Sequence, residues 1–218
     1  MKIEICKLSK IIDKNIILND VNMNLESGNI YGFVGRNGSG KTMLLKMICG
    51  FVNPSSGNIL IDDESIFQKN YFNNNIRALI EKPKFIDSLS GFDNLKLLVN
   101  INNTIDDNTI NYWLDKIGLL DEKNKLYSKY SLGMKQKLGI IQVLMENPPI
   151  MIFDEPLNGI DEKSANIVRD ILLKEKENGK LILISTHIKE DIETLCNVIY
   201  KFDNGNVQLL TNENTVKN

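Results

Sequence analysis

The residues best suited to chemistry form a glycine-rich stretch in the first fifth of the chain. It fits the pattern G-x-x-x-x-G-K-[ST] at every fixed position and consists of Gly35, Arg36, Asn37, Gly38, Ser39, Gly40, Lys41 and Thr42. Glycines let a backbone wrap around a polyphosphate with its N–H groups pointing inward. Lys41 adds a positive charge for the outer phosphates, and Thr42 adds a hydroxyl for Mg²⁺. The stretch therefore predicts a site for a nucleotide polyphosphate and Mg²⁺.

The segments on either side of this stretch support the prediction. An apolar run typical of a strand, residues 30–34, precedes it, and a helical run, residues 43–49, follows and is closed by Gly50. Strand, glycine loop and helix in this order are the context that the motif requires, because the helix N-terminus adds a favourable dipole for the phosphates.

Two further strand ends carry groups that could hydrolyse the phosphoanhydride bond to a γ-phosphate. Asp154 and Glu155 follow the apolar run 150–153, and His187, the only histidine, follows the run 181–185. Asp154 is predicted to hold Mg²⁺, Glu155 to polarise the attacking water, and His187 to hydrogen-bond the γ-phosphate or that water. A solvated acidic pair and a surface histidine are the alternatives. Because Glu155 and His187 follow a phosphate loop in the sequence, a catalytic role is favoured for both. Lys41 of the loop is the third predicted catalytic residue.

The remaining pattern predicts the elements that must position these residues. Strands are expected at 3–8, 21–25, 58–62, 76–80, 198–202 and 207–210, and helices at 90–145, 162–178 and 189–196. Residues 68–75 are expected to be irregular, and the polar tail 211–218 to be loose. Strands that alternate with helices indicate a mostly parallel sheet with helices on both faces.

Composition limits the class of protein. The chain has 218 residues, of which 42% are hydrophobic and 25% charged, as in a globular α/β protein. Its net charge of -2 offers no basic field for nucleic acid, so no nucleic-acid partner is expected. No apolar run approaches the roughly 20 residues of a membrane span. Cys6, Cys49 and Cys196 lie in apolar segments and are predicted to be buried free thiols in a reducing cytosol.

Taken together, these motifs resemble the ATP-binding subunit of ABC transporters over almost the whole chain. Residues 130–136 resemble the family's signature motif, in which Ser131 and Gly133 match and Tyr130, Leu132 and Met134 depart. Residues 156–161 resemble its D-loop, with Asp161 as the acidic residue. The resemblance implies that Ser131, Gly133 and Asp161 contact the nucleotide, and that His187 is the family's switch histidine.

The resemblance also implies the architecture. We expect an α/β structure, the P-loop NTPase fold of ABC ATPases, with a mostly parallel core sheet, N-terminal antiparallel strands and an inserted helical subdomain. Residues 1–218 would form one domain, in which 1–83 and 146–218 are the catalytic core and 84–145 the insertion.

Two positions depart from the family pattern. Glu81 stands where the family has a glutamine, and a carboxylate there can contact Mg²⁺ or its waters. Ile12 stands where an aromatic ring stacks on the adenine, and it would offer an apolar contact without a π-face. The glutamate, together with the signature sequence, resembles the branch of bacitracin-type and lantibiotic-immunity exporters.

The resemblance implies an ATPase with ATP and Mg²⁺ as its ligands. It would act as a homodimer or heterodimer of ATPase subunits and power export of a peptide antibiotic or another drug through separate permease subunits. Its place would be cytoplasmic, on the inner face of the membrane. An ABC ATPase of nucleic acid or the ribosome is the alternative, although the chain has one cassette and no cysteine cluster. A P-loop GTPase or kinase would leave residues 131–136 unexplained.

Overall fold

Two β-sheets form the centre of the molecule. The computed structural model describes residues 1–67, 74–102 and 105–210. Most of the segment expected to be irregular (68–75) and the whole of the tail (211–218) therefore lie outside the described residues. Residues 74 and 75, which are described, form a turn.

The larger sheet has six strands and carries the strand ends that matter for chemistry. Its order is β10 (Asn206–Leu210), β9 (Val198–Asp203), β3 (Asn29–Val34), β8 (Leu181–Ser185), β7 (Ile150–Asp154) and β6 (Ile76–Leu79). All neighbours pair in parallel except β10 and β9, which form the predicted hairpin. Because β3, β8 and β7 are adjacent and parallel, the segments that follow them meet at one edge of the sheet.

The smaller sheet is antiparallel and contains the N-terminus. Its order is β2 (Asn15–Glu26), β1 (Lys2–Ile12), β4 (Ser56–Ile61) and β5 (Glu64–Ser65). The first two strands are longer than predicted because β-bulges interrupt the alternation of apolar and polar residues, with register shifts between Ile5 and Leu8. Cys6 lies before the bulge and faces outward by the regular alternation from the buried Ile3 and Ile5, so the prediction of a buried thiol is wrong for Cys6, which is exposed.

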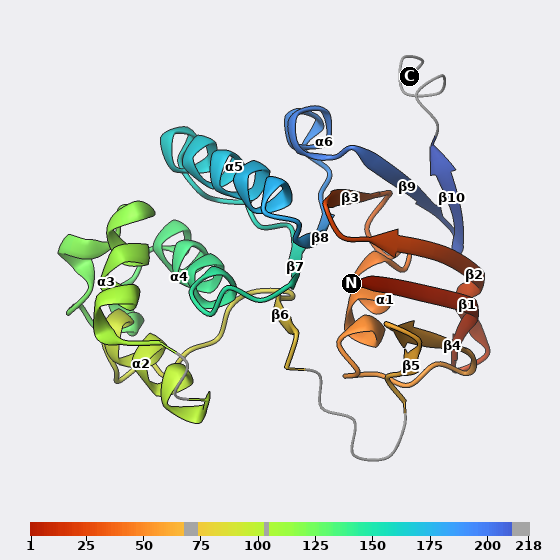
Figure 1. Cartoon of the computed structure of the whole chain (residues 1–218), viewed down its shortest axis with the longest axis horizontal. Coiled ribbons are helices and arrows are strands. Elements are labelled where there is room, and N and C mark those ends of the chain that lie inside the picture. Colours follow the sequence, from red (N-terminus) through yellow and green to blue (C-terminus); the bar gives the residue numbers. More distant parts are fainter. Residues whose placement is uncertain (68–73, 103–104, 211–218) are drawn as a thin grey trace.

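The helices divide between the two faces of the larger sheet. They are α1 (Lys41–Ile48), α2 (Gly91–Asn102), α3 (Asp107–Lys116), α4 (Leu132–Leu144), α5 (Glu162–Glu177) and α6 (Lys189–Leu195), with short 3₁₀ helices at Leu120–Glu122 and Tyr127–Lys129. Figure 1 shows α2, α3 and α4 gathered to the left of β7, and α1 with the antiparallel sheet to its right. The boundaries 84–145 of a separate helical subdomain stay a prediction.

The core follows from the period of two along the parallel strands. In β8, Ile182 and Ile184 belong to the apolar cluster that includes residues of α2 to α5, whereas Leu181 and Leu183 belong to the cluster that includes α1 and the antiparallel sheet. Every residue of β7 and β8 is buried, as expected for strands covered on both faces. This burial holds the carboxyl ends of both strands in fixed places.

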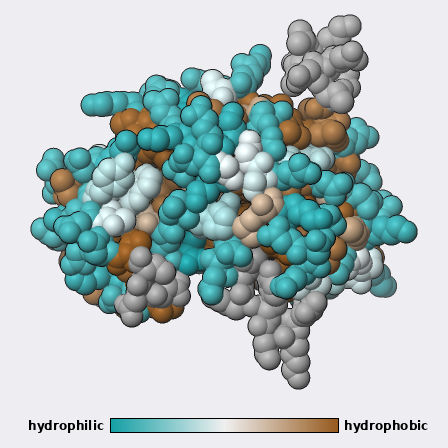
Figure 2. Space-filling view, in the orientation of Figure 1, coloured by the Kyte–Doolittle hydropathy of each residue, from teal (hydrophilic) through white to brown (hydrophobic). Residues whose placement is uncertain are grey.

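The molecular surface is mainly polar. Figure 2 shows hydrophilic residues over most of the visible face, with hydrophobic residues in several separate groups. Within the described residues, no helix combines the length and apolar character needed to span a bilayer.

Candidate active site

The glycine loop lies between the end of β3 and the start of α1, and its glycines are sterically required. Gly35, Gly38 and Gly40 have φ angles of 153°, 79° and 107°, which L side chains rarely adopt. A Cβ on Gly35 would lie 2.4 Å from the backbone oxygen of Phe202, and one on Gly40 would lie 2.7 Å from Leu18. The loop is therefore a tight backbone turn whose shape requires residues without a Cβ atom at these positions.

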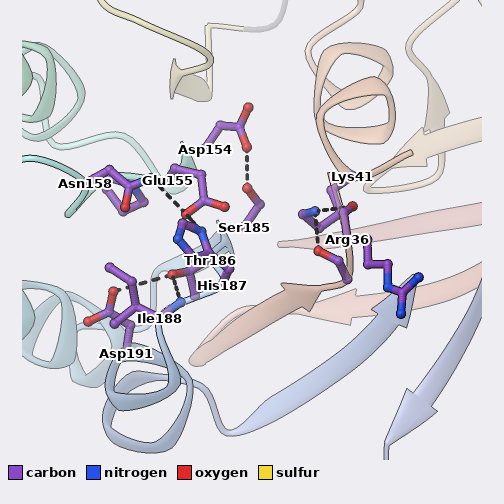
Figure 3. A network of polar contacts seen from close by, with 12 residues as sticks. Arg36, Lys41, Asp154, Glu155, Asn158, Ser185, Thr186, His187, Ile188 and Asp191 are labelled. Carbon is purple, nitrogen blue, oxygen red and sulfur yellow. Dashed lines mark hydrogen bonds and ion pairs between the residues drawn. The ribbon is translucent and has the colours of Figure 1, made fainter. Parts of the chain in front are cut away.

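Lys41 lies within this loop and makes no ion pair in the described part of the chain. Its Nζ donates to the carbonyl oxygens of Gly35 at 2.7 Å and Arg36 at 3.0 Å, as Figure 3 shows. Burial lowers the pKa of the Lys41 ammonium, and the carboxylates of Glu155 and Asp154 oppose that shift. The hydroxyl of Ser39 is also buried and has no hydrogen-bond partner among the residues that the structure describes. A phosphate group would satisfy both side chains, so the loop fits the ligand that its sequence predicts.

Thr42 and Asp154 meet across the edge of the sheet, although 112 positions separate them in the sequence. The Thr42 hydroxyl donates to Oδ2 of Asp154 at 2.8 Å. The Ser185 hydroxyl donates to Oδ1 of the same carboxylate, so both oxygens are held (Figure 3). A hydroxyl beside a buried, oriented carboxylate suits Mg²⁺, which uses one or two carboxylates together with phosphate oxygens and water.

Glu155 and His187 form a pair beside this group. Glu155 has a positive φ of 51°, and its N–H donates to the carbonyl oxygen of Ser185 at 2.9 Å. Nδ1 of His187 lies 2.9 Å from Oε2 of Glu155, and Figure 3 shows the imidazole against this carboxylate. Because an ionised carboxylate only accepts hydrogen bonds, Nδ1 carries the proton, which leaves Nε2 of a neutral His187 as an acceptor. Asn158 donates to the same carboxylate oxygen at 3.3 Å.

Ser131 and Gly133 lie at the start of α4, on the other side of β7 from the glycine loop (Figure 1). Ser131 caps the helix by accepting a hydrogen bond from the N–H of Met134 at 3.2 Å. Gly133 allows close approach to the loop after β7, because a Cβ would lie 2.7 Å from the oxygen of Gly159. Among the described residues, no hydrogen bond or ion pair joins Ser131 or Gly133 to the glycine loop.

Comparison with known proteins agrees with this geometry. The family model described as ABC transporter matches residues 18–158. The ABC transporter ATP-binding protein YybJ of Bacillus subtilis (strain 168) is 40% identical over 206 residues, which are 94% of each chain. The bacitracin transport ATP-binding protein BcrA of Enterococcus faecalis is 35% identical, over 94% of this chain and 67% of its own length.

A solved structure of the ATP-binding subunit of an ABC transporter superposes with a TM-score of 0.89 at 26% identity, over 98% of this chain and 91% of the other. The chain belongs to the ABC transporter ATP-binding family. It is an ATPase, the ATP-binding subunit of an ABC transporter, with the ABC ATPase fold. The fold and the family expected from the sequence are confirmed. The roles of the individual site residues stay predictions.

Asp161, in the segment predicted to be the D-loop of this ABC ATPase, has its carboxylate bound by residues of its own chain. It caps α5 by accepting from the N–H and the hydroxyl of Ser164, at 2.9 and 2.8 Å. Lys137 of α4 reaches the same carboxylate at 2.9 Å. The hydrogen bond from Lys137 is the main reason that the pKa of Asp161 lies well below its usual range, and the two from Ser164 add to the effect. If Asp161 also contacts a nucleotide, as predicted, it must do so in addition to its two hydrogen bonds from Ser164 and its ion pair with Lys137.

The two residues that depart from the family pattern, Glu81 and Ile12, make no side-chain hydrogen bond with the acidic strand ends among the described residues. Glu81 has a positive φ of 61° and an ion pair with Lys46 of α1 at 2.6 Å, and its side chain is largely exposed. Among the described residues, it makes no hydrogen bond or ion pair with Thr42 or Asp154. Ile12, at the end of β1, is 39% exposed, so an apolar surface is available there. The metal role of Glu81 and the base contact of Ile12 both stay predictions.

Several residues that hold the site together were not anticipated. Ser185 orients Asp154, and Asn158 holds Glu155. Gln136, buried in α4, donates to the backbone oxygens of Glu155 at 3.1 Å and Pro156 at 3.0 Å. Ser185 could have been found from its position at the end of an apolar strand. Gln136 lies in the expected helix and carries no local signal, because its partners belong to another element.

Proposed function

We propose that this ABC ATPase hydrolyses ATP, with Mg²⁺, at sites that two ATP-binding subunits share head to tail. The proposal rests mainly on one observation, that the chain offers phosphate donors in two places. The glycine loop follows β3, whereas the exposed Ser131 starts a helix on the other side of β7. A helix start with free N–H groups suits a phosphate, which a second subunit would supply. That subunit can be an identical or a related chain.

In the hydrolysis step, the chain's own residues would bind the phosphates and polarise the attacking water. Lys41 would exchange its two carbonyl partners for the outer phosphates, and the backbone N–H groups of residues 35–40 would surround them. Glu155 would accept a hydrogen bond from the attacking water and polarise it. His187, held by Glu155 through Nδ1, would offer Nε2 to the water or, when protonated, to the γ-phosphate. Mg²⁺, held by Thr42 and Asp154, would neutralise developing charge on the phosphates.

We propose further that hydrolysis powers export through separate membrane-spanning permease subunits, with the ATPase on the cytoplasmic face of the membrane. The cargo proposed is a peptide antibiotic or a similar drug. This rests on the likeness to BcrA, which is named for bacitracin transport. Relatives named for transport do not favour the alternative of an ABC ATPase acting on nucleic acid or the ribosome.

The substitution Glu155→Gln tests the catalytic part. It keeps the side-chain shape and removes the base, so turnover should fall by a factor of about 10² or more while ATP still binds. The ATP-bound pair should persist longer, which gel filtration with ATP would detect as a larger dimer fraction. Glu177→Gln, in an exposed position of α5, is the matched control. Parental turnover in Glu155→Gln would show that the assigned base is wrong.

Export can be tested in cells that produce the ATPase together with a permease encoded beside its gene. We expect growth in bacitracin to require both subunits and to be lost with Lys41→Ala, because that variant lacks the phosphate-binding charge. Equal growth with parental protein and Lys41→Ala, when both reach the same cellular level, would contradict an ATP-driven export of bacitracin. Parallel cultures with a lantibiotic would test the other cargo of this class.

A further inference from the structure

A buried polar chain lies beneath the loop that carries His187. Thr186 is 1% exposed, and its hydroxyl accepts from the N–H of Ile188 at 3.1 Å. The same hydroxyl donates to Oδ2 of Asp191, in α6, at 3.4 Å, and Figure 3 shows both contacts just below the imidazole. Thr186 and Ile188 are the residues on either side of His187. The threonine hydroxyl therefore fixes the backbone on both sides of the histidine.

Asp191 is in turn held by a buried guanidinium. It is 1% exposed, and its Oδ1 accepts from Nε and Nη2 of Arg169 at 2.9 and 2.8 Å. Arg169 is 6% exposed and also donates to Glu162 at 2.7 Å and Asn166 at 2.8 Å, both on its own helix α5. A carboxylate fixed in this way cannot rotate freely, so Oδ2 stays in place for Thr186.

The side chain of His187 itself has little to hold it. It is 62% exposed, and its one polar partner among the described residues is Glu155. An exposed imidazole with a single hydrogen bond takes its position largely from the backbone that carries it. The placement of Nε2 against a bound phosphate thus depends on the turn that Thr186 closes.

We propose that Thr186, Asp191 and Arg169 are positioning residues for ATP hydrolysis, acting through the orientation of His187. The proposal rests on the role of His187 given under the proposed function. A positioning role differs from a purely structural role, in which the Arg169–Asp191 ion pair would only join α5 to α6. A positioning role predicts that the effect of losing the hydroxyl disappears once the imidazole is gone.

The test is a double-mutant cycle between Thr186 and His187. Thr186→Val removes the hydroxyl at nearly constant volume, and Thr186→Ser restores it. We expect Thr186→Val to lower kcat about three- to tenfold, with the Kd for ATP changed less than about twofold, and Thr186→Ser to stay within about twofold of the parent. In the His187→Ala background, Thr186→Val should lower kcat by less than about twofold further.

The outcomes separate the two proposals. Parental kcat in Thr186→Val, or an equal loss with and without the imidazole, would overturn the positioning role while leaving that of His187 intact. Parental kcat in His187→Ala would instead refute the role of His187 in the proposed function. Thermal unfolding of each variant, measured at an ATP concentration lower than that of the assay, would confirm that all variants are folded at the assay temperature.

A second variant pair examines the guanidinium without leaving a buried charge alone. Arg169→Met with Asp191→Leu removes both charges together, which is often tolerated when apolar residues of similar volume replace a buried ion pair. We expect this double variant to fold, to bind ATP and to show the same loss in kcat as Thr186→Val. A folded double variant with parental kcat would remove Arg169 and Asp191 from the proposal.

Discussion

The hydrogen bonds of Gln136 give the most direct test of how α4 supports the catalytic loop. Its side-chain amide is buried and donates to the oxygens of Glu155 at 3.1 Å and Pro156 at 3.0 Å. Gln136→Met keeps the length of the side chain and removes both donors. With a net value of about 0.5–1.5 kcal/mol for each bond, the free energy of unfolding should fall by about 1–3 kcal/mol. For a chain of this length, Tm would then fall by about 2–12 °C.

The same substitution should slow hydrolysis. The carbonyl groups that lose their partners belong to the turn that holds the carboxylate of Glu155. Small displacements of a group that takes part in catalysis lower the rate strongly. We expect kcat to fall by about tenfold or more, with the Kd for ATP nearly unchanged, because no residue of the glycine loop is altered. Circular dichroism during heating and ATP turnover at saturating ATP would measure the two effects.

Gln142→Met is the matched control for this experiment. Gln142 lies on the same helix, is partly exposed, and makes no side-chain hydrogen bond within the described part of the chain. It should keep the parental Tm and kcat. If Gln136→Met and Gln142→Met have the same Tm and the same turnover, the two hydrogen bonds do not support the loop and the reasoning fails.

Three further predictions follow from local geometry. Gly133→Ala places a Cβ 2.7 Å from a backbone oxygen of the facing loop, so it should lower Tm and kcat together, as thermal unfolding and turnover would show. Of the three thiols, Cys6 is exposed, whereas burial raises the pKa of Cys49 and of Cys196 to about 12. At pH 8, a chromogenic disulfide should therefore react rapidly with one thiol in the native protein and with three in urea, and two rapid thiols would contradict the burial. Asp161 has a lowered pKa in the folded state, chiefly through a lysine of α4, so it stabilises the fold above an unfolded pKa of about 3.9 and loses that effect as the pH falls. The free energy of unfolding should therefore fall less steeply below about pH 4 in Asp161→Asn than in the parent, and parallel curves would exclude the effect.

The sequence predicted best what depends on local pattern and parallel topology. The strand, glycine loop and helix around Lys41 form one continuous segment, so their type and order were readable. Asp154 and His187 could be placed at one edge because each follows an apolar strand, and adjacent parallel strands end together. The prediction for Cys6 is wrong because it rests on the apolar residues around this cysteine, whereas the alternation from Ile3 and Ile5 places it on the outer face of β1.

The partners of the site residues could not be predicted in the same way. Ser185 reaches Asp154 across 31 positions, and Gln136 reaches the backbone of Glu155 across 19. Such contacts depend on which strands are neighbours and on how deeply a helix packs, and neither leaves a local pattern. The ion pair of Glu81 with Lys46 is a further contact of this kind, and the metal role of Glu81 stays a prediction.

Three contacts make the start of α4 and the loop after β7 one mechanical unit. Gln136 binds the backbone of Glu155, Lys137 binds the carboxylate of Asp161, and Gly133 lies against the oxygen of Gly159. A displacement of the start of α4 must therefore carry this loop with it or break the hydrogen bonds of the buried Gln136 amide, and leaving such a buried group unpaired costs about 1–3 kcal/mol. Such a displacement would act most directly on Glu155, because its carbonyl oxygen accepts a hydrogen bond from Gln136 of α4 and its N–H donates to Ser185 of β8.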